Sequence, residues 1–151
     1  MGELWLGKTV LGEWVKELNV VTEYLRSNFK AQKIIIDGTK EAGLAGLFLS
    51  ATNGNFDEVI LRNTPVSYLF DNREFIDFFS LGIHLPGFLN WGDVSLAAAH
   101  IGKNISFINS VTMSGQKISG SRLKDFKTEF DKIRAVCKQS GKTSFTETSA
   151  Q

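Results

Sequence analysis

Residues 34–46, with the sequence IIIDGTKEAGLAG, decide the fold of this chain. They begin with a β-branched run that does not alternate with polar residues, which is typical of a strand buried on both faces in a parallel sheet. The run passes through a glycine-bounded turn at residues 37–40 and continues into small and apolar residues that favour a helix. A strand, a tight turn and a helix in this order predict one unit of an α/β fold.

The rest of the chain repeats this alternation of strands and helices. Apolar periodicity and end signals predict helices over residues 9–29, 40–54, 91–102 and 123–137, and strands over residues 33–37, 58–62, 104–108 and 143–146. The first helix is expected to carry its apolar residues on one stripe, and residues 63–92 to form a helical excursion. Because connections between parallel strands require helical crossovers, we expect a parallel sheet of three or four strands with helices on both faces. Residues 1–146 form one expected domain, and residues 147–151 a disordered tail.

Composition excludes several classes of function. The 151 residues hold 17 basic and 16 acidic side chains, and no Lys/Arg block forms the basic stripe that nucleic-acid binders need. The single Cys137 excludes an internal disulfide and a multi-cysteine zinc site, and no motif indicates a cofactor. No run of about 18 apolar residues predicts a membrane span, and this chain shows no export signal. We therefore expect neither a nucleic-acid partner nor a membrane partner.

The turn after the first strand fits two phosphate-binding motifs only in part. A phosphate loop needs Gly-x-x-x-x-Gly followed by lysine and a hydroxyl; Gly38 and Gly43 fit, but Leu44 and Ala45 follow. A dinucleotide-binding loop needs a second glycine where this chain has Lys40. A small phosphate-ligand binder that uses the Gly38–Gly43 turn is therefore one alternative.

The same turn fits the frame of a nucleophile elbow, Gly-x-Ser-x-Gly. In this motif small residues flank a nucleophile that is held on a strained turn between a strand and a helix. Gly38 and Ala42 supply the small residues, Gly43 follows them, and Lys40 stands at the position of the serine. The sequence therefore predicts an elbow without its nucleophile.

Several segments together resemble one family of enzymes. The helix that begins with LGEW at residues 11–14, followed by the strand and the elbow, resembles the middle of the α/β-hydrolase carbohydrate esterases of the acetyl xylan esterase type. The segment LPGFLNWGDV at residues 85–94 resembles the stretch leading into the helix before that family's seventh strand, and residues 104–109 resemble the strand. The resemblance implies a partial α/β-hydrolase fold, the C-terminal half of the catalytic domain, in a family often secreted or periplasmic.

The resemblance also implies that the catalytic triad is lost. Lys40 occupies the nucleophile position, residues 109–114 contain no carboxylate where the family has its acid, and residues 146–151 contain no histidine where it has its base. The backbone N–H of Glu41 would be the first oxyanion donor, and the second would come from a region before this sequence. We therefore expect no catalytic residue and no metal ligand in this chain.

Individual residues also have plainer interpretations. Lys40 is interpreted as a solvated residue paired with Glu41, with a reactive lysine as the alternative. His100 is interpreted as a packed or surface histidine, and His84 as a cleft residue that lacks catalytic partners. The phenylalanines between residues 70 and 88 are expected in the core rather than around a ligand.

The first strand is expected to have a free edge, because in the family it pairs with a strand that comes earlier in the chain. Such an edge is expected to meet an upstream domain or another subunit. We therefore favour a catalytically degenerate, esterase-like unit that acts as an accessory, carbohydrate-binding or interaction domain. The alternative is the scaffold half of an active hydrolase whose triad is completed by another domain or chain.

Overall fold

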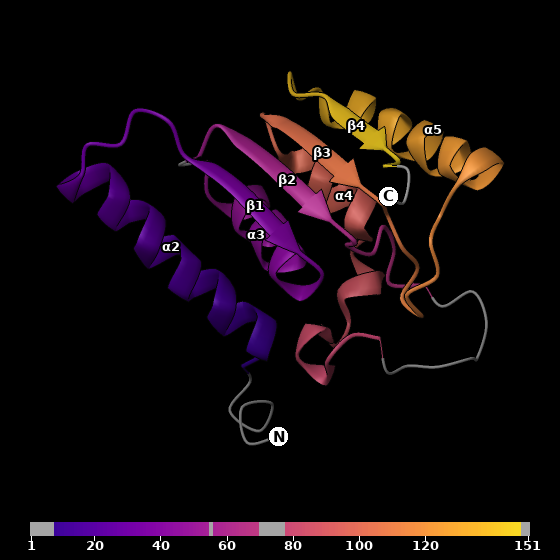
Figure 1. The fold of residues 1–151 in the computed structure, drawn as a ribbon, viewed down its shortest axis with the longest axis horizontal. Helices are drawn as coiled ribbons and strands as arrows, with labels where there is room; N and C mark the ends of the chain where they lie inside the picture. Colours follow the sequence, from indigo (N-terminus) through magenta and orange to yellow (C-terminus); the bar gives the residue numbers. More distant parts are fainter. Residues whose placement is uncertain (1–7, 55, 70–77, 149–151) are drawn as a thin grey trace.

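Four parallel strands and four α-helices form the described part of the chain (Figure 1). The computed structural model describes residues 8–54, 56–69 and 78–148. The sheet has the order β1 (Ile35–Thr39), β2 (Glu58–Arg62), β3 (Asn104–Ile108), β4 (Thr143–Thr146). The helices are α2 (Val10–Asn28), which precedes the sheet, and the connecting α3 (Glu41–Thr52), α4 (Val94–His100) and α5 (Gly120–Cys137). The expected α/β class and parallel sheet are confirmed, and the sheet of the described residues has four strands where three or four were expected.

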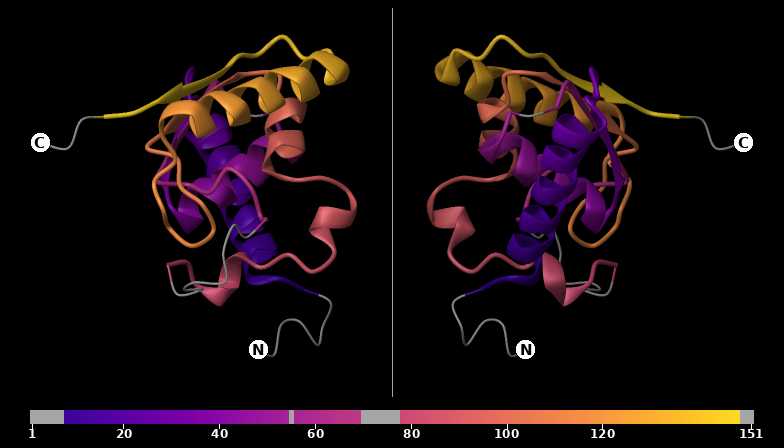
Figure 2. Two further views of the ribbon diagram at one scale, coloured as in Figure 1. Left: turned by 90° about the vertical axis from the view of Figure 1, so that its right-hand side faces the viewer. Right: turned by 90° about the vertical axis from the view of Figure 1, so that its left-hand side faces the viewer.

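The three connecting helices lie on one face of the sheet. Right-handed crossovers between neighbouring strands in sequential order require this arrangement, and Figure 2 shows the strands along one side of the molecule with the helices behind them. The covered face carries side chains that are fully buried: Val59, Leu61, Ile105 and Phe107. The hydrophobic core therefore lies between the sheet and this single layer of helices.

The opposite face of the sheet is uncovered in the described residues. Its side chains are exposed or half-buried, and strand register aligns them in rows such as Asp37, Ile60, Ser106 and Ser144. Ile35 is 45% exposed, so the prediction that the first strand is buried on both faces is wrong. The second layer of helices expected from the sequence is not supplied by α2, α3, α4 or α5.

Helix α2 extends the helical layer beyond the edge of the sheet. It packs mainly against α3 and makes no comparable contact with any strand. Leu11 and Thr22 are buried on the side that faces α3, whereas Val10, Val21 and Tyr24 are 37%, 52% and 52% exposed. The prediction of a single apolar stripe is therefore wrong: the helix has two adjoining apolar stripes, and the described residues cover the second only in part, with Trp14 packed against the core and Val21 exposed.

Several boundaries differ from the sequence-based expectation. β1 occupies residues 35–39 instead of 33–37, and the expected excursion at 63–92 contains, in its described part, only the short 3-10 helices η1 (Leu81–Ile83) and η2 (Phe88–Asn90). Residues 70–77, including two of the phenylalanines, lie outside the described residues. Phe79 is buried, and Phe78 and Phe88 pack partly buried against the core as predicted.

The chain end is held to the sheet as far as residue 148. The N–H of Thr148 donates to Asn109 Oδ1 at 2.9 Å, and Asn109 Nδ2 donates to Thr148 Oγ1 at 2.6 Å. The tail expected from residue 147 is therefore attached at this point, and residues 149–151 lie outside the described residues.

Candidate functional site

Lys40 forms a one-residue turn between β1 and α3. Its backbone has φ 53° and ψ −120°, a conformation that is strained for any residue with a side chain. The Lys40 N–H donates to the carbonyl of Arg62 at 2.9 Å, and its own carbonyl accepts from the Leu44 N–H at 3.2 Å. The turn that the sequence predicts as an elbow therefore has the sharp, strained geometry that this motif requires.

Close contact between the strand and the helix explains the small residues of this frame. A Cβ on Gly38 would lie 2.7 Å from the carbonyl oxygen of Ala42 and from the backbone of Gly43. A Cβ on Gly43 would lie 2.2 Å from Thr64 Oγ1 and 3.1 Å from the Gly38 carbonyl oxygen. Because these neighbours include backbone atoms that cannot move aside, glycine is required at Gly38 and Gly43. Ala42 itself is exposed.

The side chains of Lys40 and Glu41 do not pair with each other. The Lys40 ammonium lies over the ring of Phe78, 4.2 Å from its centroid, and the side chain is half-buried. Glu41 accepts a hydrogen bond from the Ser80 N–H at 3.0 Å. The expected Lys40–Glu41 charge pair is therefore replaced by two contacts with the segment that follows the undescribed residues 70–77.

Neutral side chains follow β3, at the position where the resemblance would place the acid of the catalytic triad. Asn109 follows β3 with φ 52° and is hydrogen-bonded to Thr148, and Ser110 is buried with no hydrogen-bond partner for its hydroxyl in the described structure. The hydroxyls of Thr112 and Ser114 lie 2.9 Å apart. This region holds no group that could serve as the acid of a triad.

The two histidines lie away from the elbow residues. His100 is exposed in the last turn of α4, and this end of the helix leads to the amino end of β3, opposite the elbow. His84 follows η1 and lines a hollow with Tyr68, Pro86 and Phe88, and none of the elbow residues lines this hollow. The structure brings neither histidine together with Lys40 in a way that would form a catalytic pair.

The turn is also too short for a phosphate loop. Thr39 still belongs to β1 and Glu41 already belongs to α3, so only Lys40 separates the two elements. A phosphate loop wraps several backbone N–H groups around the ligand. This geometry does not favour the phosphate-binding alternative. The Glu41 N–H does lie in the first turn of α3, where backbone donors are free of helical partners.

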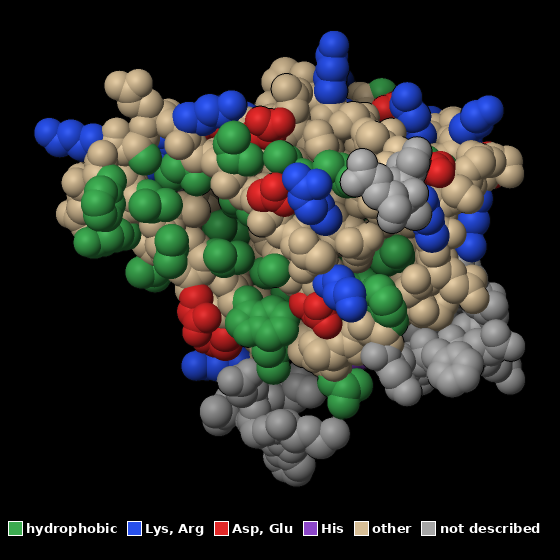
Figure 3. Space-filling model, viewed as in Figure 1, with side chains coloured by type: hydrophobic (Ala, Val, Ile, Leu, Met, Phe, Trp, Pro, Cys, Tyr) green, Lys and Arg blue, Asp and Glu red, His purple; other side chains and the backbone are tan. Residues whose placement is uncertain are grey.

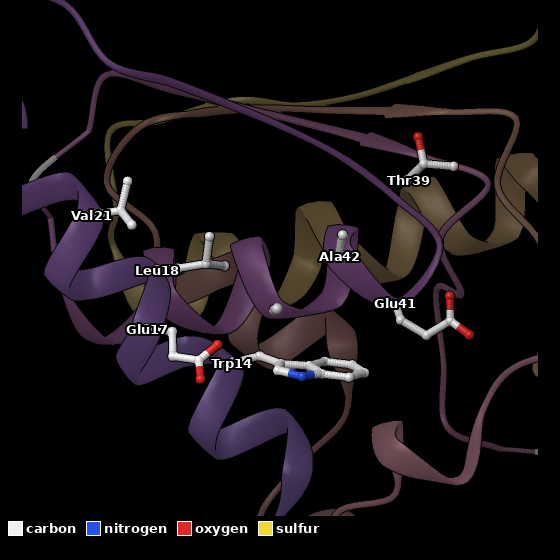
Figure 4. A pocket seen from close by; sticks show the side chains of 8 residues that line it. Trp14, Glu17, Leu18, Val21, Thr39, Glu41 and Ala42 are labelled. Carbon is white, nitrogen blue, oxygen red and sulfur yellow. The ribbon is translucent and has the colours of Figure 1, made fainter.

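A hollow of about 530 Å³ lies between α2 and the elbow (Figure 4). Its lining is predominantly apolar and comes from α2, the end of β1 and the start of α3: Trp14, Glu17, Leu18, Val21, Thr39, Glu41, Ala42 and Ala45. Sequence reasoning missed this site because it assigned all apolar residues of α2 to one buried stripe. The signal was present, since residues 10, 14, 21 and 24 follow a separate four-three spacing.

Comparisons with family models, with curated proteins and with solved structures found no significant match to this chain. Among the described residues, no cluster of His, Cys, Asp or Glu has the composition of a metal site. None of the described helices combines the length and the apolar character needed to cross a bilayer.

Proposed function

We propose that this chain is a catalytically degenerate unit of the α/β-hydrolase type, related to the carbohydrate esterases of the acetyl xylan esterase type, and that it acts as an accessory or interaction domain. The observation that carries the proposal is Lys40, which occupies the strained turn where such an enzyme presents its nucleophile. Glycines at 38 and 43 keep the close strand–helix contact that this turn needs. The frame of an active site is thus combined with a residue that cannot perform its chemistry.

Lysine is a poor replacement for the serine of an esterase. An amine that attacks an acyl group forms an amide, which does not hydrolyse readily and would end turnover after one cycle. The neutral residues after β3 supply no carboxylate to orient a base, and the described residues place no histidine beside Lys40. These features support an interaction role over an enzymatic one.

Hydrolysis assays on aryl acetates and on acetylated xylan test the proposal. Wild-type protein, Lys40→Ser and Lys40→Ala are compared with an active acetyl esterase as the positive control. We expect no turnover above buffer from any of the three, because restoring a hydroxyl alone leaves it without a base. Measurable hydrolysis by Lys40→Ser would contradict the loss of acid and base.

The alternative, an active hydrolase completed by another domain, is supported by the outer edge of β1, which no described strand pairs with. It is distinguished by assaying the full gene product. Turnover that survives Lys40→Ala and is abolished by a serine substitution outside this chain would favour the alternative. Binding to acetylated xylan, measured by depletion from solution without turnover, would instead identify a carbohydrate-binding accessory domain.

A further inference from the structure

We infer that the groove between α2 and β1 binds an extended segment of a partner polypeptide, which pairs with the outer edge of β1 and places apolar side chains on α2. The inference names a surface and a partner for the interaction domain proposed above, and it rests on that proposal. The groove is defined as the hollow lined by Trp14, Leu18, Val21, Thr39 and Ala42, together with the open edge of β1.

The first wall of the groove is backbone. Alternate residues of β1 are directed to β2, as shown by the Ile34 carbonyl, which accepts from Asp57 N–H at 2.8 Å, and the Lys40 N–H, which donates to Arg62. The intervening residues Ile35, Asp37 and Thr39 therefore direct their N–H and C=O groups to the other edge. β1 is the last strand of the sheet that the described residues form, so these groups form a template for one more strand.

The second wall is an apolar stripe of α2 that the described residues cover only in part: Val10 and Trp14 lie next to Gly82 of η1, whereas the later residues of the stripe are open. Val10, Trp14, Glu17, Val21 and Tyr24 follow one another at steps of four and three residues, so they lie on one side of the helix. Val21 and Tyr24 are both 52% exposed. Figure 3 shows apolar side chains gathered at the left of the molecule, over α2, whereas the sheet beside them shows mostly other side chains and backbone, with a few charged groups. A strand added beside β1 would lie over this stripe, as β1 and β2 lie over α3.

Charge complementarity defines the partner further. The groove contains two acidic side chains, Glu17 and Glu41, and no basic one. Glu41 accepts from the Ser80 N–H, whereas Glu17 is exposed and forms no ion pair with any described residue. The fitting segment therefore alternates apolar and polar residues and carries a lysine or arginine among the apolar positions, where it meets Glu17.

A second copy of this chain does not fit the groove. Pairing of two β1 edges about a two-fold axis must be antiparallel, with both helical layers on the same side of the joined sheet. Because α2 projects beyond β1 in that layer, it would occupy the space of the other copy's helices. An extended segment without its own helix beside it has no such clash.

The test uses a capped nine-residue peptide in which valine alternates with threonine and one central valine is replaced by lysine. Binding to the ¹⁵N-labelled chain is followed by amide NMR. We expect a dissociation constant below about 1 mM, with shifts and slowed hydrogen exchange at Ile35, Asp37 and Thr39. A peptide with glutamate in place of lysine should bind at least about fivefold more weakly.

Two pairs of matched variants locate the binding. Val21→Asp should weaken binding about tenfold or more, whereas Val20→Asp, on the adjacent exposed position outside the groove, should leave it unchanged. Ile35→Pro removes one outward N–H at the start of an edge strand, where proline is tolerated, and Ile35→Ala keeps it. Binding should fall for proline only.

Three outcomes would overturn the inference: no binding at 1 mM peptide, shifts clustered away from α2 and β1, or equal effects of Val20→Asp and Val21→Asp. A concentration-dependent dimer that Val21→Asp dissociates would assign the groove to a second copy and would also refute it. The esterase assays are independent of these readouts, so a catalytically active chain with a working groove would refute only the proposed function.

Discussion

Replacing Arg134 should destabilise the chain more than any exposed charge on the same helix. Arg134 lies on α5, is 7% exposed, and has only neutral hydrogen-bond acceptors. Its guanidinium donates to the carbonyls of Ala98, Ile101 and Gly141 at 2.8–2.9 Å and twice to Thr143 Oγ1, at 3.1 and 2.8 Å. The side chain thus joins α5 to the end of α4 and to the start of β4. Burial lowers the pKa of Arg134, and the group stays charged.

The expected loss of stability follows from the carbonyl acceptors that lose their hydrogen-bond donor. In Arg134→Met the Ala98 carbonyl still accepts from the Ile101 N–H, but the carbonyls of Ile101 and Gly141 keep no protein donor. An unpaired buried carbonyl costs about 1 to 3 kcal/mol, so two cost about 2 to 6 kcal/mol. For a domain of this size, at about 2 to 4 °C per kcal/mol, the melting temperature should fall by about 4 to 24 °C.

Urea unfolding followed by tryptophan fluorescence measures this loss. Lys132→Met on the exposed side of α5 is the matched control and should change stability by less than about 0.5 kcal/mol. Arg134→Lys should fall between the two, because an ammonium cannot reach all four acceptors. A loss below about 1 kcal/mol in Arg134→Met, with an unchanged urea dependence, would refute the reasoning, since well-packed methionine would then replace the buried cation at no cost.

Three further predictions concern β1 and its turn. Gly38→Ala should cost about 2 kcal/mol or more because the new Cβ meets backbone atoms at 2.7 Å, whereas Gly54→Ala, with open space around it, should be nearly neutral in urea unfolding. Lys40→Gly should be more stable than Lys40→Ala by about 1 kcal/mol, because only glycine relieves the positive φ; equal stabilities would mean the turn is unstrained. The hydrogen bond from Arg62 lowers the pKa of Asp37, so this pair stabilises the fold above pH about 4 and the contribution is lost as the pH falls through the lower folded pKa. Asp37→Asn should therefore show a smaller loss of stability between about pH 5 and pH 2 than the wild type; identical pH profiles would exclude the effect.

The order of strands and helices was predictable because each connection is short and each element has a clear apolar pattern. Ile34 to Ile36 identified the first strand, and the helix expected over residues 91–102 is present as α4, where Asp93 accepts from the Val94 N–H at its start. The same run gave a wrong prediction of burial. Three consecutive isoleucines indicate a strand buried on both faces of the sheet, yet the described residues cover only one face. Local pattern reports which residues can be buried, whereas the number of layers depends on what else packs on the sheet.

The environment of the turn was only partly predictable. The small-residue frame at Gly38 and Gly43 follows from spacing, because glycines at these intervals imply close contact between strand and helix. The partners of Lys40 and Glu41 do not follow from spacing, since Phe78 and Ser80 reach them from nearly 40 residues away in the chain. The predicted ion pair between Lys40 and Glu41, which rested on their opposite charges and adjacent positions, is therefore wrong.

The strain at Lys40 has its origin in the packing of β1 against α3, independently of any chemistry at the turn. Gly38 contacts the backbone of Gly43, and a Cβ on Gly46 would lie 2.6 Å from Ile36 Cγ2, so the helix lies against the strand along its first two turns. At this separation the chain must reverse direction within one residue, and the residue at that point takes a positive φ whatever its side chain. The side chain at position 40 can therefore vary, whereas the glycines cannot, because changing them would cost the core contact between β1 and α3. The elbow geometry at Lys40 is therefore explained by the packing of β1 against α3, and it is not by itself evidence of catalysis.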